Sequence, residues 1–87
     1  MSLVNFKTPL DSIENKNLRD RYSKCLSKRL KTIRRSKNLT QQELAERAGL
    51  HLTYIGHLEL GKYHPSTFTI WKIAKALEIS VGELVDC

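Results

Sequence analysis

Apolar residues recur at helical spacing along most of the chain, and no segment alternates apolar and polar residues over the length of a strand. Tyr22, Leu26, Leu30 and Ile33 follow one another at steps of four, four and three, which places them on one face of a helix. The pattern predicts a first helix from about residue 22 to residue 37. Asn38 can then adopt the left-handed conformation that closes a helix.

A second, short helix is predicted to follow at once. Thr40 and Glu43 have the Thr-x-x-Glu spacing of a capping box, in which the hydroxyl accepts from the Glu43 amide and the carboxylate reaches back. Gly49 can take a positive φ without a steric penalty and therefore suits a tight turn at the end of this helix. The apolar positions of this helix, between the capping box and Gly49, are Leu44, Ala45 and Ala48.

The third predicted helix runs from about Leu52 to Leu60 and stops at Gly61. A short helix, a glycine turn and another short helix form the outline of a helix-turn-helix unit. Ile55 and Leu58 would anchor the second of these helices and leave its opposite face and its N-terminal end free to meet the edges of DNA bases.

Two more helices complete the predicted set. The fourth spans roughly residues 67–77 behind the N-cap Ser66, and the fifth is opened by the capping-box spacing of Ser80 and Glu83. Phe68 and Trp71 lie beside the apolar stripe of the fourth helix, where core packing is favoured over an apolar dimer patch. The stripe itself consists of Ile70, Ile73, Ala74 and Leu77.

Residues 1–21 do not share this periodicity, and Pro9 excludes an early helix. We expect an N-terminal extension there, either an arm or, from Asp11 onward, a short helix. The sequence thus predicts an extension at residues 1–21 and a helix-turn-helix domain at residues 22–87, in an all-α fold of five helices.

Charge narrows the choice of partner. The net charge is +6, from 15 Lys and Arg against 9 Asp and Glu. Seven of the cations lie between Lys24 and Lys37, with no acidic residue among them. This balance fits a polyanion such as nucleic acid, although a run of charge can also be the solvated face of a helix.

Several classes of function find no support in the sequence. No apolar run approaches the roughly 20 residues that span a membrane, the start lacks the apolar region of a secretory signal, and a cytoplasmic protein is expected. Cys25 and Cys87 are far apart in the sequence, which favours two free thiols in a reducing compartment. His51 and His57 cannot chelate one metal from a single short helix, so no metal or cofactor is expected. No nucleophile-base pair or phosphate loop indicates an enzyme.

Several motifs stand together along about residues 24–85. They are Leu39-Thr40-Gln41-Gln42-Glu43-Leu44-Ala45-Glu46-Arg47-Ala48-Gly49-Leu50, then Tyr54-Ile55, Leu58-Glu59-x-Gly61-Lys62, Pro65-Ser66, Ile70-x-Lys72-Ile73-Ala74-Lys75-Ala76-Leu77 and Ser80-Val81-x-Glu83-Leu84. Together they resemble the Xre family, relatives of the lambda-type phage repressors and Cro proteins. The resemblance implies a lambda-repressor-like DNA-binding domain, usually of a transcriptional regulator that binds operator DNA as a homodimer.

The resemblance also implies roles for individual residues. Arg34 and Glu59 match positions that form an internal salt bridge between the first and third helices. Contacts to DNA phosphates are expected at Gln41, Lys62 and Arg29. Positions that face bases or the nearest backbone are His51, Leu52, Thr53 and His57.

Three departures from the family pattern bear on specificity. His51 stands where Ser or Thr commonly caps the third helix, and Leu52 can contact only an apolar feature such as a thymine methyl group. Gly56 inside the third helix is costly and could relieve crowding against the second helix or a phosphate. With few hydrogen-bonding side chains to read bases, DNA shape would supply much of the specificity.

Two functions are therefore predicted as alternatives. The first is a sequence-specific binder of double-stranded DNA that regulates transcription, most simply as a repressor. The second is an antitoxin or adaptor whose main partner is another protein, with residues 1–20 as the partner-binding arm.

Overall fold

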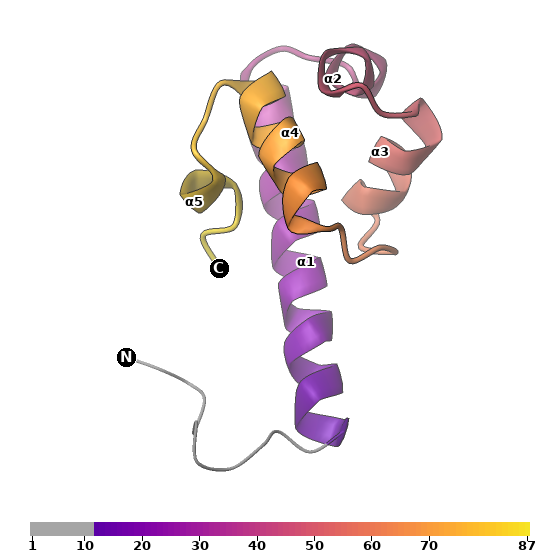
Figure 1. The fold of residues 1–87 in the computed structure, drawn as a ribbon, viewed down its shortest axis with the longest axis vertical. Coiled ribbons are helices and arrows are strands. Elements are labelled where there is room, and N and C mark those ends of the chain that lie inside the picture. Colours follow the sequence, from indigo (N-terminus) through magenta and orange to yellow (C-terminus); the bar gives the residue numbers. More distant parts are fainter. Residues whose placement is uncertain (1–11) are drawn as a thin grey trace.

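A long first helix forms the axis of the molecule, and four shorter helices pack around its C-terminal part (Figure 1). The computed structural model describes the backbone of residues 12–87 and the side chains of residues 14–87, and this part of the chain contains no strand. The helices are α1 (Ser12–Ser36), α2 (Gln41–Ala48), α3 (Leu52–Glu59), α4 (Thr67–Leu77) and α5 (Val81–Leu84). The predicted all-α fold of five helices is confirmed.

Helix α1 begins ten residues earlier than the periodicity from Tyr22 predicted. Leu26 and Leu30 anchor the helix in the core, and each residue that extends an existing helix adds one backbone hydrogen bond. No glycine or proline interrupts residues 12–36, so the helix runs through the boundary expected after residue 21. Residues 1–11 of the extension expected at residues 1–21 lie outside the described residues.

The predicted start and stop signals operate as expected. The amide of Glu43 donates to Thr40 Oγ1 over 3.0 Å, and the amide of Thr40 donates to Glu43 Oε1 over 2.9 Å. Asn38 and Gly49 adopt left-handed conformations, with φ of 58° and 67°. Ser80 and Glu83 form the second capping box, at the start of α5.

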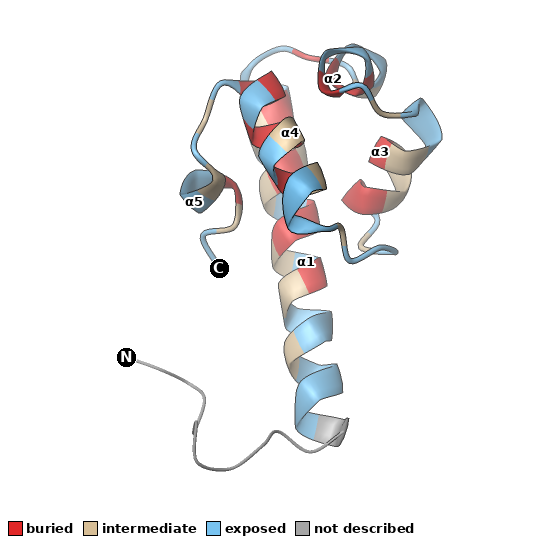
Figure 2. Cartoon of the chain, in the orientation of Figure 1, coloured by how far each residue is buried: buried red, intermediate tan, exposed pale blue. Residues whose placement is uncertain are grey.

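Every helix contributes to one hydrophobic core. Figure 2 shows the buried positions gathered where α2, α3 and α4 meet the upper half of α1. The lower half of α1 is largely exposed. The largest fully buried side chains are Leu30, Leu44, Ile55, Ile73, Leu77 and Leu84.

The expectation that Phe68 and Trp71 pack in the core is wrong. Their side chains are 64% and 48% exposed. Because the stripe that includes Ile70 and Ile73 faces inward, residues 68 and 71 project from the outer side of α4. Their rings stack with centroids 6.1 Å apart, which leaves an exposed apolar pair on the surface.

The expectation of two free thiols is also wrong, because Cys25 and Cys87 form a disulfide. Their separation of 62 residues in the sequence does not measure their distance in space, and their Cα atoms lie 5.9 Å apart. The burial of Leu84 holds α5 against the core and carries the C-terminal residues back to α1 (Figure 1). Arg29 adds to this junction, since its Nε donates to the backbone carbonyl of Glu83 over 2.8 Å.

We expect the disulfide to contribute measurably to stability. Loop-closure entropy for a separation of 62 residues predicts that reduction lowers the free energy of unfolding by up to about 4 kcal/mol. Urea unfolding with and without a reductant measures this difference. The double variant Cys25→Ser, Cys87→Ser is the control, because reductant should not affect it. Equal stability of the oxidised and reduced wild-type protein would contradict the prediction.

Candidate nucleic-acid interface

Helices α2 and α3 meet through a tight turn at Gly49. With Gly49 in the left-handed conformation, the amide of Leu50 donates to the carbonyl of Ala45 over 2.9 Å and redirects the chain. Ala45 is itself buried, and its small side chain permits the close packing of α3 on α2. The predicted helix-turn-helix unit is therefore present, as α2, the Gly49 turn and α3.

Helix α3 is buried on one side and open on the other. Ile55 and Leu58 are fully buried, whereas Thr53 is exposed and Leu52 is 46% exposed. The open side borders a concavity of about 370 Å³. Its lining comes from α1, α2, α3 and the residue that follows α3: Lys31, Gln41, Leu52, Thr53, Gly56, His57, Glu59 and Leu60.

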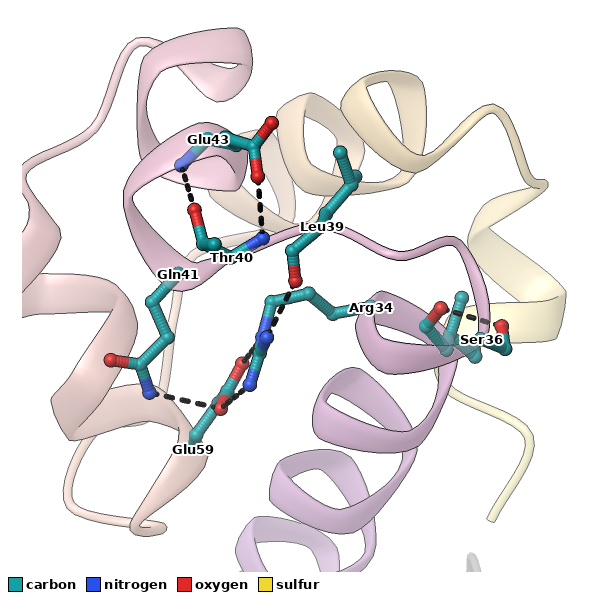
Figure 3. Close-up of polar contacts among 8 residues, drawn as sticks. Arg34, Ser36, Leu39, Thr40, Gln41, Glu43 and Glu59 are labelled. Carbon is teal, nitrogen blue, oxygen red and sulfur yellow. Dashed lines mark hydrogen bonds and ion pairs between the residues drawn. The ribbon is translucent and has the colours of Figure 1, made fainter.

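A buried ion pair sets the position of α3 relative to α1. Arg34 Nε donates to Glu59 Oε2 over 2.6 Å, and Arg34 Nη2 donates to Glu59 Oε1 over 3.0 Å (Figure 3). The two side chains are only 9% and 3% exposed. Arg34 Nη1 also donates to the carbonyl of Leu39 over 2.7 Å, which fixes the segment between α1 and α2. The structure thus contains the pair that the resemblance implied.

Gln41 joins the same network from the first turn of α2. Its Nε2 donates to Glu59 Oε1 over 3.0 Å, so one carboxylate accepts from both α1 and α2 (Figure 3). This bond holds the Gln41 amide at the concavity beside α3. Gln41 therefore supports the position of α3 in addition to any contact with a phosphate.

The network controls the ionisation of Glu59. Burial alone would raise the pKa of Glu59, but hydrogen bonds from Arg34 and Gln41, together with the charges of Arg34 and Lys31, outweigh it and lower the pKa. The hydrogen bond to Glu59 in turn raises the pKa of Arg34. Both groups are therefore charged around neutral pH, and the acidic group at the concavity is neutralised by its buried partner.

Aromatic contacts brace the loop that follows α3. The rings of Tyr54 and Tyr63 stack with centroids 5.2 Å apart, and His57 Nδ1 lies 3.1 Å from the Tyr63 hydroxyl. On the far side of the loop, His64 Nδ1 lies 2.9 Å from Ser23 Oγ on α1. These contacts fix the loop after α3 to both α3 and α1, and they engage Nδ1 of His57 rather than Nε2.

The structure brings most of the expected site residues together. Gln41, Leu52, Thr53 and His57 line the concavity, while His51 and Lys62 are exposed beyond the two ends of α3. His51 makes no side-chain hydrogen bond as the N-cap of α3. This agrees with the weak cap expected there.

Arg29 does not lie with the others. Both its Nε and its Nη2 donate to the Glu83 carbonyl at α5. The cation of α1 that does line the concavity is Lys31, which was not among the residues expected at the site. The sequence did contain a signal for Lys31: it precedes Arg34 by three residues and therefore lies near it on the side of α1 that meets α3.

Other kinds of site are not supported in the described part of the chain. No group of three or more His, Cys, Asp or Glu side chains among residues 14–87 is arranged to hold a metal ion. None of the helices in residues 12–87 combines the length and the apolar character needed to cross a bilayer.

Comparison with known proteins identifies the family of the helix-turn-helix unit. A family model, HTH_3 (helix-turn-helix), matches residues 30–84. The immunity repressor protein of Bacillus phage phi105 is 40% identical over 60 residues, which are 69% of this chain but only 42% of that protein. Control protein C.SmaI of Serratia marcescens is 40% identical over 60 residues, which are 69% of this chain and 71% of the relative.

A solved structure shows the same arrangement of helices. The restriction-modification controller protein C.AhdI from Aeromonas hydrophila aligns with a TM-score of 0.70 and 37% sequence identity. The alignment covers 71% of this chain and 94% of that chain.

The Arg34–Glu59 pair gives a prediction about stability. Glu59→Gln keeps the shape of the side chain but leaves the Arg34 charge buried without its partner. We expect the free energy of unfolding to fall by about 3 kcal/mol. Glu46→Gln, at an exposed position of α2, is the control and should change it by less than about 0.5 kcal/mol. Urea unfolding measures both values, and equal effects would contradict the role assigned to the pair.

The same variant tests the pH dependence. Because folding lowers the pKa of Glu59, its contribution is present above the pKa of the unfolded chain and is lost as the pH falls through the folded pKa. The stability difference between wild type and Glu59→Gln should therefore shrink on acidification. A difference that stays constant from neutral to strongly acidic pH would contradict this assignment.

Proposed function

Since this chain belongs to the HTH_3 helix-turn-helix family of DNA-binding transcriptional regulators, we propose that it binds operator DNA with sequence specificity by placing α3 in the major groove. One observation carries the proposal: the outer face of α3 is uncovered by the rest of residues 12–87 and is flanked by Lys31 and Lys62. An α-helix fits the major groove, and cations beside it would meet the phosphates.

The residues on this face define what could be read. Thr53 can hydrogen-bond to a base edge, Leu52 can contact a thymine methyl group, and His57 presents Nε2. His51 stands at the N-terminal end of α3, where recognition helices contact bases. Because only these short or apolar side chains are available, we propose that the shape of the operator contributes much of the specificity.

Phosphate contacts would fix the orientation of the domain on the duplex. We assign them to Gln41 at the N-terminus of α2, where helix amides favour anions, and to Lys62 in the loop after α3. Lys31 takes the place that Arg29 was expected to fill, because it lines the concavity while Arg29 contacts α5.

We further propose that two copies act together as a homodimer. Two-fold helix-turn-helix dimers place their recognition helices in successive major grooves, about 34 Å apart. The exposed rings of Phe68 and Trp71 supply an apolar surface that such a dimer would bury. A dimer patch is the alternative to core packing that the sequence left open for Phe68 and Trp71.

The physiological role follows by analogy. The names of the phi105 and C.SmaI relatives describe a repressor and a control protein, so we propose that this chain represses transcription. Its proposed site of action is the cytoplasm, in which the Cys25–Cys87 disulfide would be one of the uncommon disulfides of a reducing compartment. In this proposal residues 22–87 act as the DNA-binding domain, and residues 1–21 are its extension.

The proposed function predicts salt-sensitive binding to DNA. The purified chain should select a duplex from random DNA and retain it in a mobility-shift assay that weakens with salt. Lys62→Ala should weaken binding to all sequences alike and reduce the log-log salt slope by about 0.9. Thr53→Ala should instead change the sequence preference. Absence of salt-sensitive retention for the wild type would overturn the proposed function.

Gly56 gives a second prediction, which separates folding from binding. A methyl group at Gly56 would meet only Gln41 Oε1, at an ordinary contact distance of 3.8 Å. Packing within the protein therefore does not require glycine, and Gly56→Ala should raise the free energy of unfolding by up to about 1 kcal/mol.

If DNA approaches the backbone of α3 closely, the same methyl group should weaken DNA binding by about tenfold, or about 1.4 kcal/mol. Thermal unfolding and mobility shifts measure the two effects on one variant. Unchanged affinity would show that the duplex does not approach α3 at Gly56.

A further inference from the structure

The outer surface of α1 carries more positive charge than the α3 interface uses. Five cations recur at steps of three, four, three and four residues, and this spacing places them on one face of the helix. From Arg21 to Arg35 they extend over 14 residue steps, or about 21 Å of helix. We call this set the α1 stripe: Arg21, Lys24, Lys28, Lys31 and Arg35.

Carboxylates of the described chain do little to neutralise the α1 stripe: the charge of Lys31 acts on Glu59, but that carboxylate is already paired with Arg34. One side of α1 packs on α3, through Arg34, and another meets α5, through Cys25 and Arg29. Four members of the stripe are exposed on the remaining, outward side, and half-buried Lys31 lies at the edge of that side next to α3. None of the five forms an ion pair with another residue in the range 14–87.

The arrangement is unfavourable for an isolated helix. Like charges three or four residues apart repel each other, and the stripe contains four such neighbouring pairs. No Asp or Glu occurs between residues 21 and 35 to relieve them. A helix face that only needs to be solvated normally mixes both signs of charge. A polyanion bound along the stripe would relieve this repulsion.

The geometry favours duplex DNA as that polyanion. The stripe is straight and long, which suits a rod that carries one negative charge per about 1.7 Å better than a compact anion. Lys31 belongs both to the stripe and to the lining of the concavity beside α3. The two surfaces are therefore continuous, although they face different directions.

We propose that the α1 stripe binds the phosphate backbone of the DNA that flanks the α3 site, with the duplex bent toward α1. This inference rests on the proposed function, because it needs a duplex already seated on α3. The free-energy cost of bending the duplex would be offset by the additional phosphate contacts that the bend permits. The stripe would make affinity depend on the length and flexibility of the DNA outside the bases that α3 reads.

The test compares two lengths of one duplex obtained by selection from random DNA. The short form has about 20 bp, enough for two half-sites one helical turn apart, and the long form has about 40 bp with the same centre. The wild-type chain should bind the long form more tightly. The variant Lys24→Gln, Lys28→Gln, Arg35→Gln should lose this preference, with affinity for the long form lower by on the order of a hundredfold and a salt slope reduced by about 2.7.

A matched control removes the same charge elsewhere. The variant Lys16→Gln, Lys37→Gln, Arg47→Gln changes three exposed cations outside the stripe and should keep the wild-type preference for the long duplex. Circular dichroism checks that both variants remain folded, since glutamine forms helix about as well as lysine or arginine.

The outcomes separate this proposal from the proposed function. An equal loss in the control variant would assign the effect to net charge and overturn the proposal. If the stripe variant lost the same amount of affinity for the short and the long duplex, the stripe would not contact the flanking DNA, and the proposal would be overturned. The stripe variant could also keep wild-type DNA binding and lose binding to polyglutamate. That result would make an acidic protein the partner of the stripe and would also overturn the proposal. Failure of the wild-type chain to bind either duplex would remove the proposed function itself.

Discussion

The position of α3 depends on one buried carboxylate. Glu59 accepts hydrogen bonds from Arg34 on α1 and from Gln41 on α2, so a single side chain joins three helices. Arg34 extends the network to the Leu39 carbonyl, which sets the path between α1 and α2. Removal of this carboxylate would leave an arginine charge buried without its partner, beside the surface assigned to DNA.

A buried ion pair is not a strong source of stability compared with well-packed apolar side chains of the same size. Its value here is geometric, because directional bonds fix how α3 sits relative to α1 and α2. The apolar anchors Ile55 and Leu58 hold α3 down, but hydrophobic contact alone is not directional. The network also neutralises the one acidic group at the concavity, which keeps that surface suitable for DNA.

Local features of the fold could be predicted from the sequence because their causes are local. The capping boxes of Thr40 and Ser80 and the left-handed turn at Gly49 depend on residues three or four apart in the chain. The inward stripe of α4 follows from helical periodicity in the same way. The face of α3 that carries Leu52 and Thr53 was found because Ile55 and Leu58 must be buried.

Features that depend on contacts between distant segments were missed. The disulfide exists because α5 returns the C-terminus to α1, which sequence separation does not reveal. Arg29 and Lys31 are both cations of one basic run, and only the packing of α5 and α3 on different sides of α1 distinguishes them. The early start of α1 arises from propagation out of the packed segment, where the apolar pattern has already ended.

In the proposed complex, the uncovered face of α3 enters the major groove. Methylation interference with dimethyl sulfate tests it in one measurement, because the reagent modifies guanine N7 in the major groove and adenine N3 in the minor groove. On a selected duplex, the account predicts that guanine methylation blocks binding at two clusters about one helical turn apart. Interference by adenine methylation alone would place the protein in the minor groove and contradict the account.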